Sequence, residues 1–417
     1  MSSAESESRR TIIYVGTHKL AALRVSLENQ EPRVLGFNVQ IDPEGFEKGL
    51  VSNIQKASQS LETLIRGLCE SGQPRPENFS CYAVVGNGKL KTHTYSSSIY
   101  YQGIQRTIGP EEMRQVIRQT RSVATLPLTE FVLQAIPENY IVNDMTGIKN
   151  PAGLEAHRLG VNLKIHTMNF QDFKNISKAF EAAEIEVNGY FPKSAAVSEA
   201  VLTETEKKEG ALVIDIADEV THLTLFKEGI LSATAVIPSG GAGFTAAIAQ
   251  EWGIEPHDAR KVKEKFGTFE GAADFGGELI PIVDRTTDGH HQVRRQAFQE
   301  KFSELGKKWL ASILQAADSF AKENKVLHPH YVYTGGAAGM HGFLEFLQKN
   351  FARTGRMGLA RQVDAPNEFL VDPSVTAVLG FARWLSDEKC EQRQFLAPRG
   401  FLEKTLASAK DFFTAYF

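Results

Sequence analysis

The sequence contains two copies of one strand pattern, and this internal duplication limits the possible folds more than any other feature. The first copy opens at residues 11–25 (TIIYVGTHKLAALRV), where two apolar runs flank a Gly-Thr pair, and a third run follows at Arg33–Gln40. The second copy spans residues 211–241 and repeats the order of apolar run, short polar turn and two further runs. Both patterns predict three strands followed by a helix. A period this long indicates a duplicated domain half and excludes a solenoid of short repeats.

Duplicated halves of this kind are typical of the actin-like fold, which holds a nucleotide in the cleft between the halves. Between the two copies, residues 80–161 have a pattern of their own, with an alternating strand and a helix at Pro110–Val123. We therefore expect a small α+β subdomain inserted into the first half. After the second copy, the pattern predicts a polar loop at 284–296 that leads into a long helix at 296–324.

Composition excludes several classes of protein. The 417 residues are 42% apolar and 23% charged, which excludes disorder over most of the chain. The net charge of −4 provides no basic field, so we expect no nucleic-acid partner. The three cysteines form no CxxC pair, and the histidines have no partners at zinc-site spacing, so no metal site is predicted. The polar start, MSSAESESRR, is not a signal peptide, and no apolar run is long enough to span a membrane.

Four segments resemble the family of the bacterial cell-division protein FtsA, which is actin-like. They are residues 123–167 (VATLPLTEFVLQAIPENYIVNDMTGIKNPAGLEAHRLGVNLKIHT), 211–245 (ALVIDIADEVTHLTLFKEGILSATAVIPSGGAGFT), 331–346 (YVYTGGAAGMHGFLEF) and 372–382 (DPSVTAVLGFA). The resemblance covers nearly the whole chain, and the first segment lies in an inserted subdomain that ordinary actins lack. It implies an α/β fold of duplicated ribonuclease-H-like halves, with a small inserted α+β subdomain and a C-terminal amphipathic helix.

The resemblance also implies a division of the chain. The expected parts are a disordered tail (1–10), a first actin-like subdomain (11–78, 164–198 and 372–390), the inserted subdomain (79–163), a second actin-like subdomain (199–235 and 326–371), a small subdomain (236–325) and a membrane-targeting helix (399–417).

The first nucleotide motif of the family is altered. The family's Asp-Ile-Gly-Thr turn reads Tyr14-Val15-Gly16-Thr17 here, so the acidic residue that would organise Mg²⁺ is a tyrosine. The turn itself survives, and the resemblance implies that Gly16, Thr17 and Lys19 are the residues left to face a phosphate.

The second motif has lost its glycines. The family's Asp-Ile-Gly-Gly-Gly-Thr hairpin reads Asp215-Ile216-Ala217-Asp218-Glu219-Val220. Glycines serve in such a hairpin because backbone N–H groups must approach phosphate oxygens without an intervening Cβ. Two added carboxylates oppose a polyphosphate, since two like unit charges 4 Å apart repel by about 4 kcal/mol at an effective dielectric constant of 20.

The remaining glycine motifs are kept. Gly335 and Gly336 match the family's adenosine-side turn, and Gly240 and Gly241 match its second glycine pair. A tight turn that packs a helix on a strand would give the same Gly335-Gly336 pattern without any ligand.

These changes favour a degenerate site that binds Mg·ATP weakly or not at all, with an active actin-like ATPase as the alternative. ATP and Mg²⁺ are therefore the cofactors to test. The sequence shows no nucleophile–base pair, paired acid and base, or P-loop of another enzyme class, so we expect no catalytic residues.

The C-terminal residues 399–417 predict an amphipathic helix. At about 100° per residue, its large apolar side chains fall in one arc of roughly 160°. They are Phe401, Leu402, Leu406, Phe412, Phe413, Tyr416 and Phe417. A helix of this kind is suited to lying in a membrane interface, as the FtsA resemblance also implies. A terminal helix docked on the protein's own core is the alternative.

The resemblance implies three partners: membrane lipids, further copies of the same chain in a filament, and the C-terminal tail of the tubulin-like FtsZ, held on the subdomain at 236–325. Arg294 and Arg295 belong to a basic cluster there that is suited to an acidic peptide, although such a cluster is also common on a solvated face. The expected function is a division adaptor at the cytoplasmic face of the inner membrane. An adaptor of the related pilus-assembly type is a further alternative.

Overall fold

The computed structural model describes residues 9–27, 31–47, 49–68, 80–86, 90–103, 105–270, 277–284, 289–386 and 395–396. The predicted membrane helix at 399–417, with all seven of its apolar candidates, lies outside the described residues, and so do residues 1–8 of the predicted tail. The chain divides into two compact units. Unit 1 comprises residues 1–196, 362–364 and 381–417, and unit 2 comprises residues 197–361 and 365–380.

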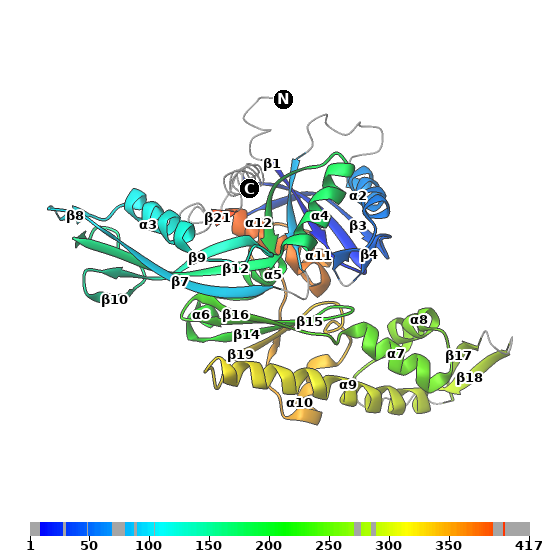
Figure 1. The fold of residues 1–417 in the computed structure, drawn as a ribbon. Helices are drawn as coiled ribbons and strands as arrows, with labels where there is room; N and C mark the ends of the chain where they lie inside the picture. Colours follow the sequence, from blue (N-terminus) through cyan, green and yellow to red (C-terminus); the bar gives the residue numbers. More distant parts are fainter. Residues whose placement is uncertain are drawn as a thin grey trace. The chain divides into compact units, whose positions relative to one another are not determined.

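Unit 1 is built on a five-stranded sheet of order β13-β6-β1-β2-β3 (Figure 1). Its strands are β1 (Arg9–Val15), β2 (Lys19–Ser26), β3 (Arg33–Ile41), β6 (Ser80–Val85) and β13 (Glu186–Pro192). Strands β1, β2 and β3 are antiparallel, whereas β6 and β13 run parallel to β1. The short strands β4 (Phe46–Glu47) and β5 (Leu50–Val51) form a separate pair.

Two helices, α2 (Ile54–Leu68) and α4 (Phe170–Ala182), cover one face of this sheet side by side (Figure 1). Their apolar residues recur at helical spacing and face one buried cluster with the strands. Helix α4 is capped by Asn169, whose side chain accepts hydrogen bonds from the backbone amides of Gln171 and Asp172 in the first turn. The core of unit 1 therefore lies between this sheet and helices α2 and α4.

The inserted subdomain of unit 1 has a sheet of order β10-β9-β12-β7, covered by helix α3 (Pro110–Val123). Its strands are β7 (Lys91–Tyr100), β9 (Glu130–Val142), β10 (Met145–Ile148) and β12 (Arg158–Asn169), with β8 (Arg106–Thr107) and β11 (Glu155–Ala156) as a separate pair. A two-residue strand near the C-terminus, β21 (Phe395–Leu396), also pairs with β9, opposite Gln134 and Ala135.

A buried carboxylate ties three of these strands together. The side chain of Glu130 is 4% exposed and accepts hydrogen bonds from Lys91 Nζ at 2.8 Å, His93 Nε2 at 2.6 Å and Thr167 Oγ1 at 2.6 Å. Burial alone would raise the pKa of Glu130, but these bonds outweigh it and lower the pKa to about 2. The carboxylate therefore stays charged near neutral pH, and its hydrogen bonds link β9 to β7 and β12.

Unit 2 repeats the sheet of unit 1, with order β16-β15-β14-β19-β20. Its strands are β14 (Ala211–Ile216), β15 (Thr221–Lys227), β16 (Ile230–Ile237), β19 (His330–Thr334) and β20 (Arg356–Met357). Again three antiparallel strands are followed by two parallel ones. The predicted duplication of three strands in each half is confirmed, and the structure extends it to the two parallel strands of each sheet.

Unit 2 also contains several helices and a separate pair of strands, and its core is rich in aromatic side chains. The helices are α5 (Lys193–Val201, which starts in unit 1), α6 (Glu204–Glu209), α7 (Gly241–Trp252), α8 (Pro256–Phe266), α9 (Arg295–Glu323), α10 (Phe343–Phe351), α11 (Asn367–Leu370), the 3-10 turn η1 (Pro373–Val375) and α12 (Thr376–Ser386, which ends in unit 1). None of the helices in the described ranges is long and apolar enough to cross a bilayer.

The loop predicted at 284–296 is wrong in part. Residues Gly289–Arg294 form strand β18, which pairs with β17 (Leu279–Asp284), and helix α9 begins directly afterwards. The polar composition of β18 concealed it, because a strand in a two-stranded ribbon need not present a regular apolar face.

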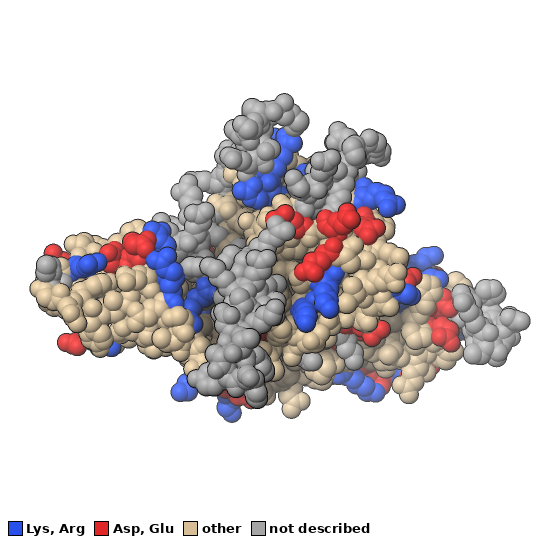
Figure 2. Space-filling model, turned by 45° about the horizontal axis from the view of Figure 1, so that its top comes forward, with Lys and Arg blue, Asp and Glu red and all other residues tan. Residues whose placement is uncertain are grey.

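Charges of both signs occur on one face of the molecule. On the face shown in Figure 2, Lys and Arg side chains occur in small groups beside groups of Asp and Glu, and no continuous basic surface is visible among the described residues there.

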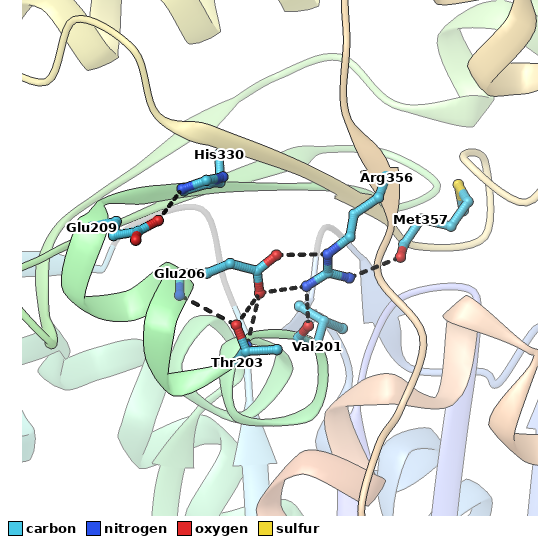
Figure 3. Close-up of polar contacts among 7 residues, drawn as sticks. All are labelled: Val201, Thr203, Glu206, Glu209, His330, Arg356 and Met357. Carbon is cyan, nitrogen blue, oxygen red and sulfur yellow. Dashed lines mark hydrogen bonds and ion pairs between the residues drawn. The ribbon is translucent and has the colours of Figure 1, made fainter.

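The last strand of the unit 2 sheet is fixed by an arginine. Arg356 donates to both carboxylate oxygens of Glu206, at 2.7 and 2.6 Å, and to the carbonyl oxygen of Val201 at 2.6 Å (Figure 3). Thr203 and Glu206 form a reciprocal cap at the start of α6. Burial alone would raise the pKa of Glu206, but the bonds from Arg356 and Thr203 lower it to about 2.

We predict that Arg356→Ala lowers the free energy of unfolding of unit 2 by about 3 kcal/mol, because a mostly buried carboxylate loses its partner. Urea denaturation measures this loss. The deficit should shrink as the pH falls from the ordinary Glu pKa of 4.5 towards 2, because protonation of Glu206 then removes the ion pair from the wild type as well.

Arg114→Ala is the matched control, because Arg114 pairs with Glu111 on an exposed helix surface and its loss should cost less than about 1 kcal/mol. Equal stability of the two variants at pH 7 would contradict the proposed importance of Arg356.

Candidate functional site

Two glycine-containing turns meet the hairpin that follows β14 in unit 2. Gly335 follows β19 with a φ of +89°, and a Cβ there would lie 2.5 Å from both Asp215 Oδ1 and the carbonyl oxygen of Ile216. That same carbonyl oxygen accepts a hydrogen bond from the amide of Ala337 at 3.1 Å. The turn after β19 is thus bound to the end of β14, and Gly335 allows the close approach.

The start of α7 is bound to the same place. The amides of Gly241 and Ala242 donate to the carbonyl oxygens of Ala217 and Asp218 at 2.9 and 2.7 Å. A Cβ on Gly240 would lie 2.4 Å from the Asp218 oxygen, so glycine is required for this packing alone. Two amides of the first turn of α7 are therefore occupied by backbone oxygens of the altered hairpin.

Two cations of α8 face this junction, and our sequence analysis missed them. Arg260 donates to the carboxylate of Asp218 at 3.1 Å, and Lys263 Nζ lies 2.7 Å from Thr245 Oγ1 and 3.3 Å from the Gly241 carbonyl oxygen. Burial lowers the pKa of Lys263, and the nearby charge of Asp218 opposes that shift. Their spacing of three residues on a helix is the signal that could have found them, because it places both on one face.

The corresponding turn of unit 1 is filled by a side chain. A Cβ on Gly16 would lie 2.7 Å from the hydroxyl oxygen of Tyr14 and 2.9 Å from the carbonyl oxygen of Lys19. The Thr17 hydroxyl accepts a hydrogen bond from the amide of Gly49, and the Gly16 amide donates to the Lys19 carbonyl oxygen at 3.2 Å. The space that glycine leaves open is taken by the phenol, so this turn does not fit a phosphate group.

Comparisons with known proteins agree on one family. The model for the SHS2 domain inserted in FtsA matches residues 89–167, and the model for cell division protein FtsA matches residues 212–380. The chain is 25% identical to a cell division protein FtsA of Pseudomonas aeruginosa over 91% of this chain and 90% of that protein. It is 27% identical to one of Escherichia coli over 67% of this chain and 68% of that protein.

The chain belongs to the FtsA family.

Solved structures show the same actin-like fold at low sequence identity. A chain of a PilM–PilN type IV pilus biogenesis complex is 15% identical with a TM-score of 0.61, covering 89% of this chain and 97% of that one. The ethanolamine utilization protein EutJ of Carboxydothermus hydrogenoformans is 13% identical with a TM-score of 0.50, covering 90% of this chain and 89% of that one. The predicted actin-like fold with an inserted subdomain is confirmed for this FtsA relative.

The predicted site residues thus fall into separate groups. Asp215, Gly240, Gly241 and Gly335 meet at one junction of unit 2, and exposed Gly336 borders it, whereas Gly16, Thr17 and Lys19 form the turn of unit 1. Within the described ranges, no three His, Cys, Asp or Glu side chains are grouped to hold a metal ion.

The two candidate arginines for a peptide partner have different surroundings. Arg294 is exposed at the end of β18, whereas Arg295 Nη1 binds both carboxylate oxygens of Glu278, at 2.8 and 2.7 Å. Lys301, one of the basic residues on helix α9, contacts Glu251 and Glu304. Arg294 is therefore the residue of this pair with an exposed side chain.

We predict that Gly335→Ala lowers the free energy of unfolding of unit 2 by about 3 kcal/mol or more, because the new Cβ meets backbone and the left-handed φ is strained. Thermal or urea unfolding checks this expectation. Gly336→Ala is the adjacent control: its Cβ would meet only Ser374 Cβ at 3.9 Å, so its cost should stay within about 0.5 kcal/mol. Equal stability of the two variants would show that the turn at position 335 does not require glycine.

Proposed function

We propose that this FtsA-family protein is a peripheral membrane adaptor of cell division. It tethers FtsZ filaments to the cytoplasmic face of the inner membrane at the division site and polymerises with itself. The observation that carries this proposal is the inserted sheet of β7 to β12, because this region matches the model for the domain inserted in FtsA. The aromatic pattern of residues 399–417 supports the membrane contact.

The proposal includes a degenerate nucleotide site. It is supported by the phenol of Tyr14 inside the Gly16 turn and by the occupied amides of Gly241 and Ala242. The carboxylates of Asp218 and Glu219 add repulsion, although Arg260 offsets the charge of Asp218. On this basis the adaptor works without Mg·ATP, whereas an active ATPase would require it.

The decisive experiment is recruitment of FtsZ to vesicles of phosphatidylethanolamine and phosphatidylglycerol by the full-length protein, with and without Mg·ATP. We expect equal recruitment in both conditions. Recruitment only with Mg·ATP would favour the active ATPase. Membrane binding of the protein without FtsZ recruitment would favour an adaptor of another machine, such as pilus assembly.

Variants of the C-terminal segment test in the same assay whether membrane binding depends on its apolar or on its basic side chains. Phe412→Ser with Phe413→Ser should reduce vesicle binding at least tenfold, because each buried phenylalanine contributes about 1.5–3 kcal/mol. Lys404→Gln with Lys410→Gln is the control and should bind nearly normally, since the local charge is almost balanced. Unchanged flotation after deletion of 399–417 would refute the membrane helix.

For the FtsZ tail, we predict that Arg294→Glu weakens binding of the isolated C-terminal tail peptide about fivefold to tenfold, because an exposed positive charge is reversed. Fluorescence anisotropy of a labelled peptide measures the affinity. Lys349→Glu on α10 reverses another exposed positive charge in unit 2 and serves as the control. Arg295 is unsuitable for this test, because a glutamate there would face Glu278. Equal affinity of Arg294→Glu and Lys349→Glu would remove Arg294 from the proposed site.

A further inference from the structure

Three parallel strands of unit 1 end side by side. Strands β1, β6 and β13 are in register, with Val15 opposite Val85 and Val85 opposite Pro192. The next residues are Gly16, Gly86 and Lys193. In open α/β sheets this carboxyl edge is where ligands bind.

The side chain of Lys193 runs along this edge. Lys193 is the first residue of α5 and is 6% exposed. A Cβ on Gly86 would lie 2.7 Å from its Cβ and 2.8 Å from its Cδ. Gly86 therefore has no side chain where the aliphatic stem of Lys193 passes, so the stem is packed against backbone instead of extending into water.

The ammonium group of Lys193 lies over an aromatic ring. Its Nζ is 5.5 Å from the centroid of the Tyr14 ring, within the range of a cation–π contact. A positive charge at the start of a helix is disfavoured by the helix dipole, and the electron-rich ring face offsets part of that cost. The hydroxyl of the same tyrosine lies beside Gly16. The side chains of Lys193 and Tyr14 are therefore in contact with each other and together fill the space between Gly86 and Gly16.

We propose that Tyr14 and Lys193 are a built-in occupant of the first nucleotide turn, which we name the Tyr14–Lys193 plug. The plug holds the turn in shape by filling the space that a phosphate would take, and it excludes Mg·ATP from unit 1. This inference rests on the degenerate site proposed above and identifies the residues that close it. It also gives Gly16 and Gly86 a role, because the absence of a Cβ at both leaves room for the plug.

Acetylation of lysine amines by N-hydroxysuccinimidyl acetate, followed by peptide mass spectrometry on the full-length protein, tests the plug. Lys193 should react slowly in the wild type and in Tyr14→Phe, which keeps the ring. It should react about tenfold faster in Tyr14→Ala, because the ring that covers the ammonium group and holds it as a cation is lost. Lys207 is the internal reference, since it is 5% exposed and paired with Glu199 and Glu204 in unit 2.

A rapid reaction of Lys207 would reveal general unfolding of a variant. In that event Tyr14→Leu, which keeps most of the volume but lacks the ring, replaces Tyr14→Ala. Unchanged slow labelling of Lys193 in a folded Tyr14→Ala or Tyr14→Leu protein would overturn the plug. Labelling of Lys193 in the wild type as fast as that of exposed Lys349 would overturn it too.

Calorimetric titration of the wild type with Mg·ATP separates the two proposals. Saturable binding in the low micromolar range would refute the degenerate site and the exclusion of Mg·ATP, even if Lys193 stays protected. Absence of binding together with a readily labelled Lys193 would refute the plug and leave the degenerate site standing. We expect no saturable binding and a protected Lys193.

Discussion

Three carbonyl oxygens at the end of β14 hold the glycine turns of unit 2 together. Those of Ile216, Ala217 and Asp218 accept the amides that open the turn after β19 and the first turn of α7. Buried backbone groups need hydrogen-bond partners. Here the two glycine turns supply the donor amides, and the hairpin after β14 supplies the acceptor carbonyl oxygens. The positions of Gly240 and Gly335 follow from this arrangement, because a Cβ on either residue would collide with those oxygens. Packing of α9 depends on it as well, since Trp309 Nε1 donates to the Gly240 carbonyl oxygen at 3.0 Å.

The two duplicated halves solve the same packing problem by different means. At the end of β14, the altered hairpin is stabilised by backbone hydrogen bonds and by the contact of Asp218 with Arg260. At the end of β1, the space is filled by the ring of Tyr14. Packing therefore requires glycine at these places with or without a ligand, so a glycine motif can reflect ligand binding or packing. A glycine pattern by itself does not distinguish these two uses, whereas the atoms next to the missing Cβ do.

Much of the fold could be predicted from the sequence, because the duplicated apolar pattern predicts three strands in each half and the helices have clear periodicity. The replacement at Tyr14 was visible as a departure from the family motif, but the direction of its phenol was not. Lys193, Arg260 and Lys263 were missed because they approach the turns from elements far away in the sequence. Strand β18 was predicted as loop because its residues are polar, although its partner β17 directly precedes it in the sequence. What local pattern cannot provide is the identity of side chains that meet only through tertiary packing.

The short strand β21 ties a segment near the end of the sequence to the inserted sheet. Phe395 and Leu396 pair with Ala135 and Gln134 of β9, which is also paired with β10 and β12. This ladder comprises two residue pairs, whereas the ladder between β9 and β12 runs along most of both strands. A pulling force applied at Leu396 would therefore separate β21 from β9 before it disrupts the inserted sheet itself.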